Sequence, residues 1–302
     1  MNEARSPPAN APSRLTVFCL AALVCLIWGS TWLVIKLGLR DVPPFTGASL
    51  RFVISGSCMA ALVWLLRHRE SKARPPWPAV VSQGLLQFGF NYAVVYVSET
   101  IIPSGLVSVL WAVFPLCVAL ASHFIVKSAY LSGRQWLGMG IAFLGVASLF
   151  VTDIASLSSA AIPMGLLVLS SPILVTVPTL LIKKTAHNAN LLILNRDSMW
   201  IGAVILGALA FMRESGAALH ITPLAIFCIL YLAIPGTVVT FGVYLWLLRH
   251  VPAYRLSIVS FVTPAIALLV GALFGGEPLT PATAVGSTLV LAGIFLVLKR
   301  TA

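Results

Sequence analysis

The sequence has few charged residues. They make up 9% of its 302 residues, hydrophobic residues make up 59%, and the mean hydropathy is +1.01. Soluble domains usually carry about 25% charged residues. The shortage of charge excludes an ordinary water-soluble protein. Apolar runs of about twenty residues, each long enough to cross a bilayer, recur from end to end.

Cysteine is scarce and is not spaced for metal binding. All five cysteines fall inside apolar runs, without a CxxC pair or a Cys/His cluster, so we expect buried free thiols, no metal site and no cofactor. The sequence GxxxxGK[ST] is also missing, which argues against ATP drive within this chain. The formal charge of +11 comes from basic residues that stand singly or in pairs. This pattern indicates membrane topology rather than binding to nucleic acid.

The chain contains a long internal repeat. In the first copy the landmarks are Pro103, Ser108, Pro115, Gly138 and Gly145, and in the second they are Pro252, Ser257, Pro264, Gly286 and Gly293. The copies are offset by 149 residues at the first three landmarks and by 148 at the two glycines. Such paired landmarks indicate two homologous halves.

Ten apolar spans are predicted to be transmembrane helices, because a backbone in hydrocarbon must satisfy its own hydrogen bonds and the alternating pattern of barrel strands is missing. The spans are Leu15–Lys36, Pro44–Leu66, Trp77–Val97, Ser104–Val126, Gly133–Val151, Ala160–Ile182, Leu191–Met212, Pro223–Leu248, Tyr254–Gly275 and Pro281–Leu298. The predicted domains are a disordered cytoplasmic tail over residues 1–14, a first five-helix repeat over residues 15–152 and a second over residues 160–298. Proline is expected to interrupt the sixth span, and to kink the fourth at Pro115 and the ninth at Pro264.

The basic residues favour a topology with both termini in the cytoplasm. On that topology all of the 19 basic residues fall on the cytoplasmic side except Lys36, Arg40, Arg51 and Arg213, and the other side carries Asp41, Glu99, Asp153, Glu214 and Glu277. This is the asymmetry of the positive-inside rule, and it predicts a multi-pass protein of the cytoplasmic membrane. Because five spans per half is an odd number, the halves are predicted to be inverted repeats, an architecture that recurs in transporters.

Several motifs resemble a known family. They are WGSTW at Trp28–Trp32, Ile35-Lys36, Arg51-Phe52, the paired prolines and the paired glycines of the two halves. Together they are similar to the EamA repeats of the drug/metabolite transporter superfamily, over about residues 16–298. The resemblance implies a ten-helix transporter of small metabolites, frequently an exporter, with a central cavity between the halves and the fifth and tenth helices at the periphery. Glu277 matches a Gly-Glu feature of these repeats, whereas the first half has Ala129 at the aligned place.

Polar residues inside the spans are the candidate substrate-binding groups. Gln83, Gln87 and Asn91 recur every four residues on one face of the third span. Thr237, Thr240 and Tyr244 lie on the corresponding eighth span, where Thr240 aligns with Asn91. Amides and hydroxyls in hydrocarbon need partners, so these faces are predicted to point inward. Hydrogen bonding between helices is the alternative interpretation.

Two further groups complete the predicted site. Trp28, Ser30 and Thr31 lie near the middle of the first span, and Trp111 lies on the fourth. Small-residue helix packing is the alternative for the first group. Arg51 is the basic residue set several positions inside an otherwise apolar run. It could pair with Asp41 or Glu99, snorkel, or bind an anionic group of the substrate, and the structural interpretations are preferred for it.

The sequence therefore predicts an all-α integral membrane protein that transports a small organic metabolite or drug-like solute by alternating access, as an exporter. The alternative is a membrane-embedded enzyme acting on a lipid-linked or amphiphilic substrate, but no His/Asp/Glu cluster lies at one membrane edge. An enzyme is therefore not expected. A receptor would need an appended binding domain, which the sequence does not show. The expected partners are a small-molecule substrate and the lipid bilayer, and a homodimer is left open.

The charge asymmetry predicts the topology. Single cysteines at Lys72 and Lys184, in a background without the five native cysteines, should be labelled from the cytoplasm, and a reporter fused to the C-terminus should also lie inside. A C-terminus on the outside would require an odd number of spans and would contradict the inverted-repeat hypothesis.

Overall fold

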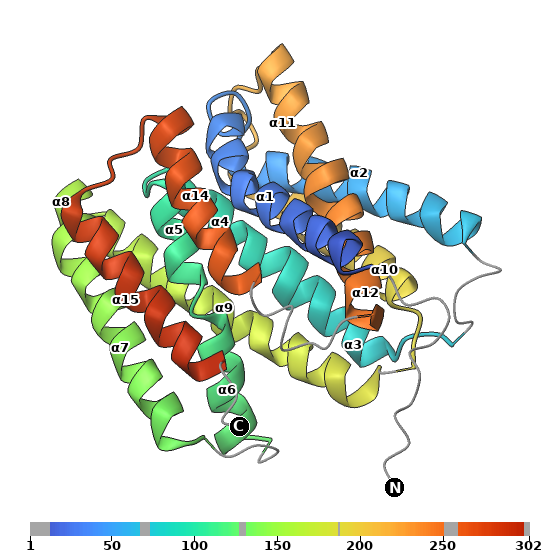
Figure 1. Cartoon of the computed structure of the whole chain (residues 1–302). Coiled ribbons are helices and arrows are strands. Elements are labelled where there is room, and N and C mark those ends of the chain that lie inside the picture. The colour runs from blue at the N-terminus through green and yellow to red at the C-terminus, as the bar shows by residue number, and fades with distance from the viewer. Residues whose placement is uncertain (1–12, 67–72, 127–130, 187, 251–258, 299–302) are drawn as a thin grey trace, which may run out of the picture.

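The computed structural model describes residues 13–66, 73–126, 131–186, 188–250 and 259–298, and within these ranges the chain is helical without β-strands. Outside the described residues lie residues 1–12 of the tail that was predicted over residues 1–14, the start of the ninth span at Tyr254, and the repeat landmarks Pro252 and Ser257. Figure 1 shows the helices packed as one bundle, with α7 and α15 side by side at one edge.

The helices follow the predicted spans closely. In the first half they are α1 (Arg14–Gly38), α2 (Pro44–Leu65), α3 (Trp77–Ser82), η1 (Gln83–Asn91), α4 (Tyr92–Glu99), α5 (Ser104–Trp111), α6 (Phe114–Phe124), α7 (Gly133–Leu149), η2 (Phe150–Ile154) and α8 (Ala155–Leu157). In the second half they are α9 (Ala161–Thr185), α10 (Leu191–Arg213), α11 (Pro223–Ala233), η3 (Ile234–Val239), α12 (Thr240–His250), α14 (Val259–Gly275) and α15 (Pro281–Leu298). The η segments are π-helical.

Eight of the helical segments are long and apolar enough to cross a membrane. The exceptions among the ten predicted spans are the third, which carries the amide-bearing face of η1, and the ninth, of which α14 is described over 17 residues. The surface is that of a multi-pass membrane protein, because large apolar side chains such as Phe18, Leu144 and Val204 are about 70% exposed. A water-soluble protein rarely leaves so much apolar surface uncovered.

Two glutamates tie the halves together at one end of the bundle. The Glu214 carboxylate, at the end of α10, accepts hydrogen bonds from the backbone N–H groups of Phe45 and Thr46 at 2.7 and 2.8 Å. The Glu277 carboxylate, which follows α14, accepts from the N–H groups of Ser104 and Gly105 at 2.6 and 3.0 Å. Each glutamate therefore caps a helix of the other half, where unpaired N–H groups and the helix dipole favour a negative charge.

Two aspartates act similarly at the same end. Asp153, in η2, accepts hydrogen bonds from the hydroxyls of Thr280 and Thr283 at the start of α15. Asp41, after α1, accepts one from Thr222, whose hydroxyl in turn caps α11. We call this end, which carries Asp41, Asp153, Glu214 and Glu277, the carboxylate face. All four carboxylates join one half of the chain to the other.

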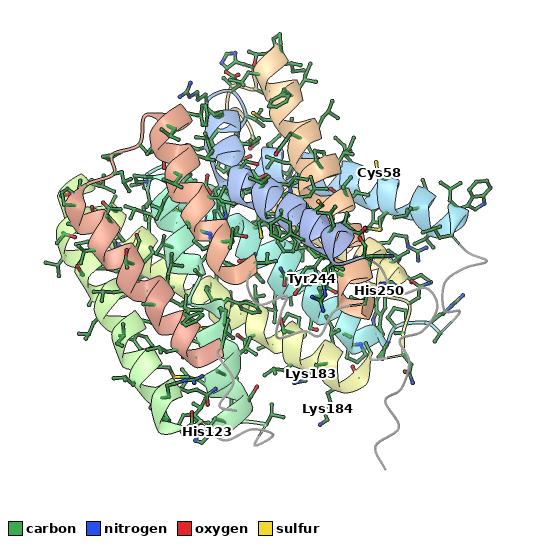
Figure 2. All side chains as sticks on the ribbon, in the orientation of Figure 1. Cys58, His123, Lys183, Lys184, Tyr244 and His250 are labelled. Atoms are coloured by element: carbon green, nitrogen blue, oxygen red, sulfur yellow. The ribbon has the colours of Figure 1, made fainter. Side chains whose placement is uncertain are left out.

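The first helices of the two halves run in opposite directions. α1 ends at the carboxylate face, whereas α9 begins there, a short link after η2. At the opposite end of the bundle, which we call the basic face, α9 ends with Lys183 and Lys184 and α12 ends with His250 (Figure 2). Arg134, at the start of α7, lies at this face and donates a hydrogen bond to a backbone carbonyl near the end of α15.

The paired glycines of the repeat form the contact between α7 and α15. A Cβ atom on Gly145 would lie 2.7 Å from the carbonyl oxygen of Gly286, and one on Gly293 would lie 2.4 Å from the carbonyl oxygen of Gly138. Only glycine allows two helix backbones to approach so closely, which is how small residues join helices in a membrane.

Proline acts differently in the three spans where the sequence predicted an interruption or a kink. The prediction of an interrupted sixth span is wrong, since α9 is one helix of 25 residues with Pro172 and Pro178 inside it. α14 continues past Pro264, whereas the fourth span is interrupted just before Pro115, between α5 and α6. The remaining irregular segments are π-helical. η1 and η3 lie at matching places in the two halves when the 149-residue offset is applied.

The close packing of α7 on α15 predicts the effect of a single methyl group. Gly145→Ala should lower the free energy of unfolding by about 1–3 kcal/mol, because the added Cβ meets backbone atoms that cannot turn away. Gly140→Ala is the matched control, since Gly140 is exposed on the same helix with open space around its Cβ position. The measurement is the thermal unfolding midpoint of the purified variants in detergent. Equal midpoints would contradict the glycine contact.

Candidate substrate-binding cavity

A cavity of about 370 Å³ lies between the two halves, within the usual size range of small-molecule sites. It is lined by Trp28, Thr31, Trp32 and Ile35 of α1, Arg51 of α2, Gln87, Asn91, Tyr92 and Val95 of η1 and α4, Ser108, Trp111, Phe114 and Pro115 of α5 and α6, Val175 and Thr179 of α9, Phe241 and Tyr244 of α12, and Val259, Thr263 and Pro264 of α14. The peripheral helices α7 and α15 contribute none of these lining residues. Tyr244 marks the cavity near the centre of the bundle in Figure 2.

Aromatic rings form much of the wall. Trp28 packs against Tyr244 and Phe241, with ring centroids 5.4 and 5.8 Å apart. On the other side Trp111 lies 6.4 Å from Trp32 and stacks on Phe114 at 5.3 Å. These contacts join α1 to α12 of the second half and to α5 of the first. They create an apolar, largely rigid surface for the body of a ligand.

Asn91 is the centre of a hydrogen-bond network in the cavity wall. Its side-chain oxygen accepts from the Trp111 indole N–H at 2.8 Å and from the Ser171 hydroxyl at 2.7 Å, while its Nδ2 donates to the Gln87 carbonyl oxygen at 3.2 Å. These bonds connect η1, α5 and α9. Asn91 is 3% exposed, and its amide is occupied by the protein, so it positions the wall.

Gln87 differs from Asn91 and from Gln83. Its side chain lines the cavity and makes no hydrogen bond to another described residue, which leaves its amide available to a ligand. The Gln83 amide lies one turn away and is 7% exposed. It donates to the Asn195 side chain at 3.0 Å, so it joins η1 to α10. Of the three amides predicted to share one helix face, Gln87 is therefore available to a ligand, whereas Gln83 and Asn91 bond to other parts of the protein.

The structure brings six of the ten predicted site residues together at the cavity and leaves four in the helix interfaces around it. The six are Trp28, Thr31, Gln87, Asn91, Trp111 and Tyr244, and the four are Ser30, Gln83, Thr237 and Thr240. Ser30 hydrogen-bonds the Tyr231 hydroxyl at 2.7 Å, and the Thr240 hydroxyl donates to the Thr237 carbonyl oxygen at 3.4 Å. Ser30, Gln83 and Thr237 thus bond to other helices, whereas Thr240 bonds within its own span.

Several residues that line the cavity are not among the predicted site residues. Trp32 belongs to the WGSTW motif and follows Trp28 by one helical turn, a spacing that could have found it. Tyr92 follows Asn91 directly, and Phe241 follows Thr240.

For Arg51 the preferred predictions are a structural ion pair or snorkelling. Arg51 is instead 2% exposed at the cavity wall, and among the described residues no carboxylate pairs with it.

Helix contacts lie between the cavity lining and the carboxylate face. There Lys36 of α1 donates hydrogen bonds to the backbone carbonyl oxygens of Glu99 and Ile102, and Glu277 holds the start of α5. The Glu99 side chain is fully buried, and neither carboxylate oxygen makes a hydrogen bond. At the other end the lining reaches Thr179 and Val259, near the basic face.

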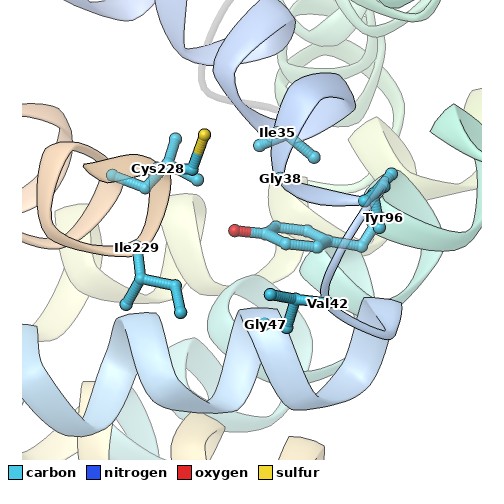
Figure 3. Close-up of a pocket in the computed structure, with 9 residues that line it drawn as sticks. Ile35, Gly38, Val42, Gly47, Tyr96, Cys228 and Ile229 are labelled. Carbon is cyan, nitrogen blue, oxygen red and sulfur yellow. The ribbon is translucent and has the colours of Figure 1, made fainter. Parts of the chain in front are cut away.

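A second crevice between α1, α2 and α11 is too small for a substrate. Its volume is about 10 Å³, which is at the lower limit for one water molecule. Figure 3 shows the Tyr96 ring filling most of the space between Val42, Cys228 and Ile229. Across the described residues, no group of three His, Cys, Asp or Glu side chains gathers to hold a metal ion.

The profile of the EamA-like transporter family matches this chain twice, over residues 15–151 and 162–299. The chain belongs to the EamA-like transporter family. This confirms the resemblance drawn from the WGSTW motif and the paired landmarks. The two family domains supply opposite walls of the cavity, with α1, α2, α4, α5 and α6 from the first and α9, α12 and α14 from the second.

Relatives of this EamA-like protein carry transporter names. The uncharacterized transporter YoaV of Bacillus subtilis is 25% identical, with 90% of this chain and 93% of YoaV covered. A probable amino-acid metabolite efflux pump of Salmonella typhimurium is 28% identical, with 92% and 93% covered. The uncharacterized inner membrane transporter YedA of Escherichia coli is 27% identical, with 88% and 85% covered. A crystal structure with 18% identity aligns with a TM-score of 0.68 over 94% of this chain and 98% of its own, so it shares the fold.

The Asn91 network predicts a loss of stability that depends on its partners. Asn91→Leu should lower the free energy of unfolding by about 1–3 kcal/mol for each buried donor that it leaves unpaired. Adding Ser171→Ala to Asn91→Leu should recover part of the loss, because that change removes one of the two unpaired donors. Thermal unfolding of the single and double variants measures this coupling. If the two losses simply add, the network is not the source of the effect.

Proposed function

We propose that this EamA-like protein is a secondary transporter that moves a small organic solute out of the cytoplasm by alternating access, with ten membrane-crossing segments arranged as two inverted five-helix repeats. The observation that carries the proposal is the central cavity, which is lined from both halves and lies between helices that reach both faces of the bundle. Its wall combines an apolar aromatic surface with a few polar groups, as binding sites for small molecules usually do.

The opposed directions of α1 and α9 support alternating access. Inverted halves can exchange two similar conformations, and the exchange opens a central site to one side and then to the other. The π-helical segments η1 and η3 match between the halves: η1 contributes Gln87 and Asn91 to the cavity wall, and η3 leads into α12, which contributes Phe241 and Tyr244. Such segments are frequent at functional sites, because their backbone departs from the regular helical ladder.

We assign the carboxylate face to the outer side and infer that the cavity is closed there in this conformation. The four carboxylates that join the halves would have to release their helix N-termini for the cavity to open there. The basic face is the proposed cytoplasmic side, where Lys183 and Lys184 end α9 in agreement with the positive-inside rule. In this scheme the structure represents the conformation in which the cavity opens towards the cytoplasm. The bilayer surrounds the bundle.

An enzyme is the weaker proposal. Apart from the Arg51 guanidinium, the polar side chains that line the cavity are amides, hydroxyls and indoles, and these lining residues include no carboxylate or histidine to serve as a general base. The name of the Salmonella typhimurium relative, an amino-acid metabolite efflux pump, favours a solute of about that size. A homodimer stays an untested prediction.

A matched pair of variants tests the transporter proposal. Gln87→Leu should weaken transport about two- to tenfold, the loss expected for one hydrogen bond to the solute, and should leave the unfolding midpoint unchanged. Gln83→Leu, one turn away, should do the reverse, because it removes the bond to Asn195 without altering the cavity.

The measurement is export by cells that express each variant at equal level. Extracellular and intracellular metabolites of cells with and without the wild-type protein first identify a transported solute. Efflux of that solute from preloaded cells then gives the rate. Unchanged export by Gln87→Leu together with loss of export by Gln83→Leu would place the transport path outside the cavity.

A further inference from the structure

The cavity wall holds a buried cation that has no ion-pair partner. Arg51 of α2 is 2% exposed, and its guanidinium carbon lies 4.8 Å from the ring centroid of Tyr92 and 5.6 Å from that of Phe52. Its Nε donates to the Thr237 hydroxyl at 3.1 Å, and that hydroxyl donates onward to the Leu232 carbonyl oxygen at 2.8 Å. Two aromatic rings and one threonine therefore fix the orientation of the guanidinium.

Part of the remaining hydrogen-bonding capacity of Arg51 is unused. Its Nη1 is buried and makes no hydrogen bond. The titratable side chains that act on it are Tyr92, Tyr96 and Glu99. The Tyr96 hydroxyl also interacts with the guanidinium, but a hydroxyl does not supply the anion that an ion pair needs.

Glu99 does not pair with Arg51 in this conformation. Of the described residues, Arg196 and Asp197 form the salt bridge, while Arg51 forms none. Both oxygens of Glu99 are buried without a hydrogen bond, and the carboxylate interacts electrostatically with Lys36 and Glu277 as well as with Arg51. Asp41 is occupied by Thr222. The ion pairs considered from the sequence are therefore not formed, and an exposure of 2% rules out snorkelling.

The lining of the cavity has one sign of charge. Arg51 is its charged member, since the lining residues in the described part of the chain include no aspartate, glutamate, lysine or histidine. A guanidinium is always charged, and removing it from water is unfavourable unless an anion and hydrogen bonds replace the lost hydration. An anion inside the cavity would supply both. A cationic solute would meet an uncompensated positive charge.

We propose that Arg51 binds the carboxylate of a monoanionic organic solute, whose apolar body packs on the aromatic wall of the cavity. This inference rests on the proposed transport function and names its substrate class. A single guanidinium with one edge held by Thr237 matches a group of one negative charge. The rings of Trp28, Trp32, Trp111 and Tyr244 surround the rest of the solute. Arg51 is thus a specificity-determining residue.

Matched ligands test the charge preference directly. The probes are 3-phenylpropanoate, its neutral amide 3-phenylpropanamide and the cation 3-phenylpropylamine, together with the pair indole-3-acetate and indole-3-acetamide. Binding to the purified full-length protein in lipid nanodiscs is followed by quenching of tryptophan fluorescence, because three tryptophans line the cavity. Each acid should bind at least about tenfold more tightly than its amide, the range expected for a hydrogen bond to a charged group, and the amine should bind least.

Variants assign the preference to Arg51. Arg51→Gln should weaken binding of both acids about ten- to a hundredfold and leave amide binding unchanged. Arg51→Lys keeps the charge without the planar fork and should be intermediate. Arg213→Gln is the control, because it removes an exposed basic residue at the end of α10, away from the cavity. Unfolding midpoints without ligand show whether each variant is folded, and Arg51→Lys supplies the test if Arg51→Gln is not.

The inference is wrong if neither acid binds the wild-type protein better than its amide, or if Arg51→Lys and Arg51→Gln keep the full preference for acids. These outcomes are distinct from failure of the transport proposal. Transport of a neutral or cationic solute that depends on Gln87 would keep the transport function and reject the anionic substrate class.

Discussion

The arrangement of the two halves depends on carboxylates that bind the N-termini of helices across the interface. Near a membrane the free N–H groups of a helix start need partners, and a carboxylate supplies strong acceptors together with a charge that favours the helix dipole. Glu214 and Glu277 of the second half cap α2 and α5 of the first, while Asp41 and Asp153 contact the threonines that begin α11 and α15. Because these contacts share one face, they hold the two halves together at that end of the bundle.

The repeat is symmetric in its helix packing and asymmetric in its closing contacts. The glycine pairs of α7 and α15 meet each other directly, so each half supplies an equivalent surface. Glu277, in contrast, aligns with Ala129 in the first half, and an alanine cannot cap a helix start as a carboxylate does. In the proposed cycle, closure of the basic face therefore has no counterpart of the Glu277 contact, which biases the protein towards the conformation closed at the carboxylate face.

Polar groups at the cavity fall into two kinds. Asn91 and Gln83 have their hydrogen bonds satisfied by other helices, and they stabilise the wall. Gln87 and Arg51 have unused donors at the cavity, and they are the groups that a solute can engage. The Nη1 of Arg51 is buried, and an unpaired buried donor is costly, so a solute that satisfies it gains affinity. This is how a largely apolar cavity can still select its ligand by charge.

The sequence by itself determined the helices, the repeat and the family. Runs of about twenty apolar residues must be helical in hydrocarbon. The observed helix starts at Pro44, Ser104, Gly133 and Pro281 therefore agree with the starts predicted from the sequence. It also placed Gln87 and Asn91 on one helix face through their spacing. The tertiary structure alone decided that Asn91 is occupied and Gln87 is available, that Ser30 and Thr240 face other helices, and that Arg51 has no ion-pair partner. Whether a polar side chain has a partner depends on neighbours far away in the sequence, 186 positions for Arg51 and Thr237 and 201 for Ser30 and Tyr231, and local spacing carries no information about them.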